Sequence, residues 1–239
     1  MRKDQWALLA AGLVSVAIWM APALRPVLWP LTLFNTHIHE LCHALAALVT
    51  GGLPTHIVVN ANGSGVTPVT GGLLLVVASA GYVGSAVTGG LVVAFARDEK
   101  SSRRVLATLG WVLVGSMALL VRGDIAGILV GMAWAVGLVT LAHYVRGPAA
   151  SFLARFLGLQ LGLTALQALA VLLNLSTWGD AMTDAKILEQ TTFVPALFWA
   201  VGWALSALVA LTLGLRSAWN GKTVRAAKYA QYRPSGRGG

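Results

Sequence analysis

The sequence predicts an all-α polytopic membrane protein with about seven transmembrane helices and a short β-hairpin-like insertion after the second helix. Of its 239 residues, 57% are hydrophobic and only 10% are charged, whereas a soluble domain carries roughly 25% charged residues. The apolar residues form stretches of about 20, which is the length that a helix needs to cross a bilayer. The single cysteine, Cys42, excludes an intrachain disulfide.

Seven apolar stretches account for the predicted spans, and most of the links between them are brief. The stretches are residues 6–24, 28–50, 72–96, 105–121, 125–145, 152–175 and 194–215. The first follows two basic residues, as a signal peptide would. A second apolar stretch comes almost directly after it and no cleavage site is evident, so we treat the first stretch as a span.

Two interior links are long enough to hold structure of their own, residues 51–71 and 176–193. The first has β-branched runs on both sides of Asn62-Gly63, a pattern typical of a β-hairpin. The third apolar stretch carries Gly81, Gly84, Gly89 and Gly90. Small residues at such spacings let membrane helices approach closely, so we expect this helix to pack tightly on its neighbours.

The domain organisation follows from the same pattern. Residues 1–215 are predicted to form one membrane-embedded domain, and residues 216–239 a basic, disordered tail. The net charge of +9 indicates orientation in a bilayer, and the tail has no nucleic-acid-binding motif, so no nucleic-acid partner is expected. We expect a multi-pass protein of the cell membrane. The sequence indicates no oligomeric state.

A metal-binding pattern lies inside the second span, at His39-Glu40-Leu41-Cys42-His43. Residues four apart share one face of a helix, so His39 and His43 can bind one zinc ion while Glu40 reaches a water molecule bound to it. Ionisable side chains inside a membrane helix are costly unless they are partnered, which favours a functional role. The alternative is a set of polar side chains that pack helices together.

The stretch from Thr36 to Leu45, followed by Thr50-Gly51-Gly52, resembles the site-2 protease family of intramembrane zinc metallopeptidases, most closely a compact bacterial branch. Three further stretches occur in the order that the family shows: 63–67, 78–85, and Thr183-Asp184-Ala185 leading to Trp199 and Trp203. The resemblance covers roughly residues 30–210. The Leu-Asp-Gly stretch that usually supplies the third metal ligand in that family is absent.

A catalytic zinc usually has three protein ligands and one open position, and the chain has only eight acidic residues. The links after the second, fourth and sixth spans share one side of the membrane, which leaves Asp124, Asp180, Asp184 and Glu189 as candidates for the third ligand. The resemblance favours Asp184, because it falls in the matching Asp-Ala stretch. Asp124 is the alternative, since it stands directly before a span.

These features predict an intramembrane zinc metalloprotease that hydrolyses peptide bonds of a membrane protein or a membrane-associated peptide, with Glu40 as the general base. The hairpin edge could bind such a substrate by strand addition. One alternative is an inactive relative that acts by binding membrane partners, which the missing Leu-Asp-Gly stretch favours. The other is a multi-pass metal or proton transporter.

Overall fold

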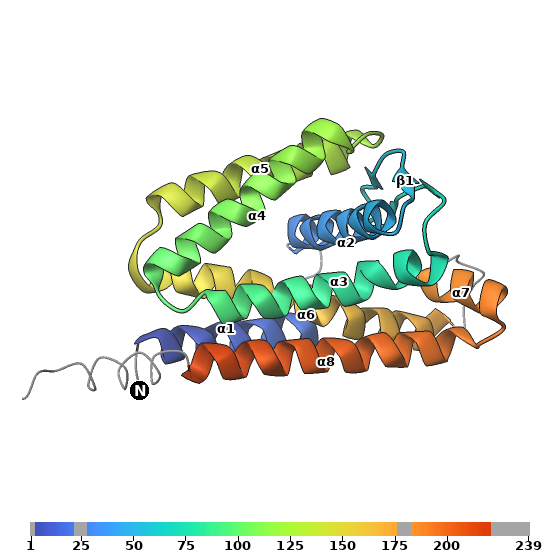
Figure 1. The fold of residues 1–239 in the computed structure, drawn as a ribbon. Helices are drawn as coiled ribbons and strands as arrows, with labels where there is room; N and C mark the ends of the chain where they lie inside the picture. The colour runs from blue at the N-terminus through green and yellow to red at the C-terminus, as the bar shows by residue number, and fades with distance from the viewer. Residues whose placement is uncertain (1–2, 22–27, 176–182, 221–239) are drawn as a thin grey trace, which may run out of the picture.

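Long helices make up most of the chain, as the computed structural model shows (Figure 1). It describes residues 3–21, 28–175 and 183–220. In chain order the elements are α1 (Lys3–Met20), α2 (Trp29–Val49), β1 (Leu53–Pro54), β2 (Val58–Val59), β3 (Gly65–Val66), β4 (Val69–Thr70), α3 (Leu74–Phe95), α4 (Glu99–Leu119), α5 (Ile125–Tyr144), α6 (Gly147–Leu175), α7 (Asp184–Thr192) and α8 (Ala196–Asn220).

The helices are arranged so that α2 is enclosed. Helices α3, α6 and α8 pack against one another, and α1 packs on α6. Helices α4 and α5 form a pair on the opposite side of α2 (Figure 1). Helix α2 therefore has protein on two sides, and most of its polar side chains are buried, including Asn35, His37, His39, Glu40 and His43.

Helices occupy the positions of all seven predicted spans, but only part of the membrane prediction is confirmed. Within the described residues, three helices are long and apolar enough to cross a bilayer: α3, α5 and α8. Helix α4 begins at Glu99, ahead of the predicted residue 105, because Asp98 and Ser101 form a capping box at its start. The predicted link 176–193 contains α7, and the predicted tail at 216–239 begins inside α8; residues 221–239 lie outside the described part of the chain.

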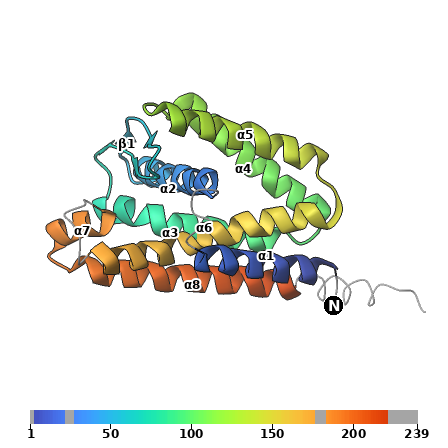
Figure 2. The ribbon, with the colours of Figure 1, turned by 180° about the vertical axis from the view of Figure 1, so that it is seen from behind.

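The direction of α1 differs from an alternating seven-helix arrangement. Helices α1 and α2 run the same way along the long axis, and α1 starts at the end of the molecule where α8 finishes (Figures 1 and 2). From α2 onward, α3, α4, α5, α6 and α8 alternate in direction (Figure 1). This order gives six alternating helices, with α1 as an additional helix on the outside of α6.

The predicted hairpin is present after α2 as two short antiparallel ladders. Strand β1 pairs with β4, and β2 pairs with β3. The outer edge of this hairpin is also paired, because Ile57 N donates to Leu120 O at 2.9 Å and Arg122 N donates to Ile57 O at 2.8 Å. The hairpin is thus fixed between α2 and the α4–α5 connection.

Close helix packing occurs where the glycines of the third span predicted it. A Cβ at Gly89 would meet the backbone of α6 at Gly158 and Gly162, and a Cβ at Gly90 would meet the backbone of α8 at Ala210. The same helix also approaches α2, since a Cβ at Gly84 would lie 2.9 Å from Cys42. Helix α3 therefore packs closely on three helices, one of which carries the metal-binding pattern.

Candidate metal centre

Two imidazoles meet on one face of α2. His39 Nε2 lies 3.0 Å from His43 Nε2, and the two rings meet edge to face with their centroids 4.7 Å apart. One ligand atom from each of His39, Glu40 and His43 lies within 4.8 Å of the other two. The four-residue spacing thus brings the predicted donors together in a buried part of the helix.

Asp184 reaches the same point from α7, far away in the sequence. Its Oδ2 lies 3.2 Å from His39 Nε2 and 3.4 Å from His43 Nε2. The Asp184 carboxylate therefore completes a triangle with the two imidazole nitrogens.

Helix α3 fixes the orientation of His43. The Nδ1–H of this ring donates to the Val77 carbonyl oxygen at 2.6 Å, which leaves Nε2 with a free lone pair facing His39 and Asp184. One turn further on, Gly81 lies directly under both rings, and a Cβ there would collide with His39 and His43. The approach of α3 thus depends on a residue without a side chain.

The hairpin holds Glu40 on the neighbouring face of α2. Thr67 Oγ1 lies 2.7 Å from Glu40 Oε2 and 3.1 Å from the Glu40 backbone oxygen. Gly65 lies against the carboxylate so closely that a Cβ would collide with Oε1. Nearby, Thr36 Oγ1 donates to Gly63 O at 2.8 Å. These contacts fasten the hairpin over Glu40 and restrict the rotamer of its side chain.

Most of the chain matches a known protein family. A model of the peptidase M50B-like family matches residues 8–214, which is most of the chain and includes all four clustered side chains. The chain belongs to the M50B-like peptidase family. The predicted resemblance to site-2 proteases is thereby confirmed at the level of the family. No curated protein and no solved structure matches the chain.

The remaining acidic candidates of this M50B-like chain have other partners. Asp124 is the N-cap of α5, where its Oδ1 accepts from Ala126 N at 2.7 Å and from Gly127 N at 3.2 Å. Glu189 accepts from Lys186 Nζ and from Ala196 N. Asp180 lies outside the described residues. The geometry therefore favours Asp184 over Asp124 as the carboxylate beside the two histidines.

Two aromatic rings connect the cluster with the last helix. Tyr82 meets His39 edge to face with ring centroids 4.5 Å apart, and it stacks on Trp203 with ring centroids 5.0 Å apart. Neither Tyr82 nor Thr67 was predicted as a residue of the site. Both residues lie in stretches that the family resemblance covered, 63–67 and 78–85, but nothing in the local sequence links Thr67 to Glu40.

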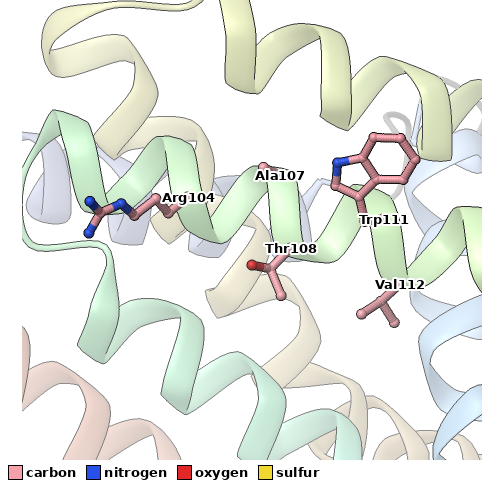
Figure 3. A pocket seen from close by; sticks show the side chains of 5 residues that line it. All are labelled: Arg104, Ala107, Thr108, Trp111 and Val112. Atoms are coloured by element: carbon pink, nitrogen blue, oxygen red, sulfur yellow. The ribbon is translucent and has the colours of Figure 1, made fainter.

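A groove on α4 lies apart from this cluster. Its lining consists of Arg104, Ala107, Thr108, Trp111 and Val112, which all come from one helix (Figure 3). None of these five side chains contributes a donor to the His39–Asp184 cluster. We therefore assign the groove no part in the chemistry.

Proposed function

We propose that this M50B-like chain is a zinc-dependent intramembrane peptidase, with His39, His43 and Asp184 as metal ligands and Glu40 as the general base. The observation that carries the proposal is the convergence of two imidazole nitrogens and one carboxylate oxygen within 3.0–3.4 Å of one another, beside a second carboxylate on the next residue of α2. The family match supports peptide hydrolysis as the reaction.

The donor set fits a zinc ion. Ligand atoms about 2.0–2.2 Å from zinc in a tetrahedron lie about 3.3–3.6 Å from one another. The three donor atoms are separated by 3.0, 3.2 and 3.4 Å, so one pair has this spacing and the other two would move apart by a few tenths of an ångström around the ion. Nitrogen and carboxylate donors are those that zinc takes in catalytic sites, where three protein ligands leave one position open. His39, His43 and Asp184 would hold the ion.

In this mechanism the protein residues position the reactants and transfer a proton. A zinc ion bound there would supply a Lewis acid that activates water and polarises the scissile carbonyl. Glu40 accepts the proton of the attacking water and then delivers it to the leaving amine. Thr67 keeps the Glu40 carboxylate turned to one side of α2, and Val77 keeps the lone pair of His43 Nε2 directed at the cluster.

The membrane environment of the site is part of the proposal. Beyond α3, α5 and α8, we propose that α2, α4 and α6 also cross the cell membrane, because they alternate with the three apolar helices (Figure 1). The substrate is then a membrane protein or a membrane-associated peptide. The β3–β4 edge lies next to Glu40 through Gly65 and Thr67, which supports strand addition as the way an extended substrate binds.

Substitution of the general base tests the proposal. Purified Glu40→Gln should bind zinc with the stoichiometry of the wild type and cleave a fluorescent casein or single-span peptide substrate at least about 100-fold more slowly, because a positioned base contributes 10²–10⁴ to the rate. Glu99→Gln, in the first turn of α4, is the matched control and should cleave normally. Cleavage by Glu40→Gln at the wild-type rate contradicts the role of Glu40.

Two alternatives give different results in the same preparation. A relative that acts only by binding partners would bind zinc but cleave no substrate in the wild-type form. A transporter would take up zinc into sealed vesicles, and His39→Ala would abolish that uptake. The clustering of His39, Glu40, His43 and Asp184 at one point, with a proton acceptor beside the ligands, favours hydrolysis over both.

A further inference from the structure

Helix α7 carries Asp184 but cannot fix its own position. It has nine residues, Asp184–Thr192, which is too short to be stable alone. Its apolar face holds it on the bundle, since Ala185 and Leu188 are buried in a cluster with Ala78 of α3 and Trp203 of α8. Apolar contacts are less directional than a hydrogen bond, so these two side chains define the position of α7 along the bundle only loosely.

A hydrogen bond at the other end of α7 fixes the position of the helix along the bundle. Glu189 Oε2 accepts from the backbone N–H of Ala196, the first residue of α8, at 2.8 Å. Its second oxygen, Oε1, accepts from Lys186 Nζ at 2.7 Å, which steadies the rotamer of the carboxylate. The first N–H groups of a helix have no partner within it, so Glu189 satisfies one donor of α8 and fastens α7 to α8.

The two acidic residues of α7 lie on different faces of this short helix. Asp184 and Glu189 are five residues apart, which corresponds to roughly 7.5 Å along the axis and about 140° around it. One carboxylate therefore faces α2 and the other faces the start of α8. A shift of the Glu189 anchor moves the whole short helix, and with it the oxygen that lies 3.2 Å from His39.

We propose that Glu189 is the positioning residue that holds Asp184 in the metal centre. This inference rests on the proposed function, in which Asp184 is a ligand. Residues that orient a metal ligand without touching the metal typically contribute 10- to 100-fold to metal affinity. We expect Glu189→Ala to weaken zinc binding by about tenfold, although Glu189 itself does not reach the cluster.

The test measures metal binding by the full chain in detergent. Zinc affinity is determined by competition with a chelating dye, and the visible spectrum of the Co²⁺-loaded chain reports the ligand set. Asp184→Asn should weaken zinc binding and change the Co²⁺ spectrum, and Glu189→Ala should change that spectrum in the same direction. Glu189→Gln keeps an acceptor for Ala196 N and should bind zinc as the wild type does. Glu99→Ala removes an acid elsewhere and is the matched control.

The outcomes separate this inference from the proposed function. If Asp184→Asn binds zinc as tightly as the wild type, Asp184 is not a ligand and the proposed metal centre fails. If Asp184→Asn weakens binding while Glu189→Ala binds normally, the positioning role is overturned and the metal centre stands. Glu189→Asp keeps the charge but shortens the side chain. If Glu189→Ala does not fold, weaker zinc binding by Glu189→Asp than by Glu189→Gln supports the inference, and equal binding refutes it.

Discussion

Gly81 shows how strictly a single residue can constrain the cluster. It lies under both imidazoles, and an added Cβ would collide with the nitrogen that each ring directs at Asp184. Neither ring can retreat freely, because His43 is hydrogen-bonded to Val77 and His39 lies against Tyr82. The absence of a side chain at this position is therefore a requirement of the site.

Gly81→Ala should lower zinc affinity by at least about tenfold, the range found when the surroundings of a metal ligand are disturbed. Alanine is a better helix former than glycine by roughly 1 kcal/mol, so the loss will not come from a weaker helix. Gly137→Ala in α5 is the control, since a Cβ there meets nothing within 4 Å. Equal zinc affinity in the two variants, measured by dye competition, would show that Gly81 does not constrain the ligands.

Thr67 is the second residue whose role depends on one contact. Its hydroxyl lies 2.7 Å from Glu40 Oε2. Thr67→Val keeps the shape but loses the donor, and a misplaced catalytic group costs up to about 100-fold in rate. We expect Thr67→Val to cleave casein 10- to 100-fold more slowly at unchanged zinc stoichiometry. Thr67→Ser should restore cleavage, and failure of serine to do so would mean that the methyl group matters rather than the hydrogen bond.

Local spacing in the sequence predicted only some residues of the metal centre. His39, Glu40 and His43 were predictable because their geometry is set within one helical turn. Asp184 came from the family resemblance, and the structure brings it from α7 to within 3.4 Å of both histidines. Thr67 and Tyr82 were not assigned, because hydroxyl and aromatic side chains carry no spacing signal and their partners lie on other elements.

At the scale of elements, the long helices were predictable from the sequence, whereas α7 and the placement of the hairpin were less so. Apolar length fixes where the long helices occur, and Asn62-Gly63 marked the hairpin. The pairing of Ile57 with the α4–α5 connection and the existence of α7 depend on tertiary contacts, which no local pattern contains. The hairpin and α7 lie at the same end of α2, where they enclose the cluster from two sides.

The α7–α8 junction should be sensitive to acid. Two hydrogen bonds lower the pKa of Glu189 from its ordinary 4.5. The one from Lys186 has the larger effect, and the one from Ala196 N has the smaller. A lowered pKa means that the carboxylate stabilises the folded chain above pH 4.5 and that this contribution is lost as the pH falls through the folded-state value. The difference in thermal midpoint between wild type and Glu189→Gln should therefore be largest near pH 6–7 and shrink below about pH 4.5.

Lys186→Met provides the control for this pH dependence. It removes the largest cause of the lowered pKa, so much of the acid sensitivity should disappear with it. A difference between wild type and Glu189→Gln that stays constant from pH 7 to pH 4 would contradict the assignment.

The whole molecule has two dissimilar ends. The hairpin, the α4–α5 connection and α7 gather at one end, and the α3–α4 and α5–α6 links lie at the other (Figure 1). The sequence predicted alternation from its apolar stretches, but it could not predict that α1 and α2 run in the same direction (Figures 1 and 2), because hydropathy has no direction. The start of α1 and the end of α8 consequently lie at the same end of the bundle.

Cysteine labelling on a Cys42→Ala background tests this arrangement in membranes. Single cysteines at Asn62 and Thr191, both exposed, should react with an impermeant maleimide from one side of the membrane. Cysteines at Lys100 and Arg146, also exposed, should react only from the other side, because α3 and α6 separate the two groups.

A cysteine at Gln5 discriminates between six and seven crossings. Six crossings place Gln5 on the same side of the membrane as Lys100, whereas seven alternating spans place it on the same side as Asn62. Labelling of Asn62 and Lys100 from the same side would refute the alternation of α2 to α8.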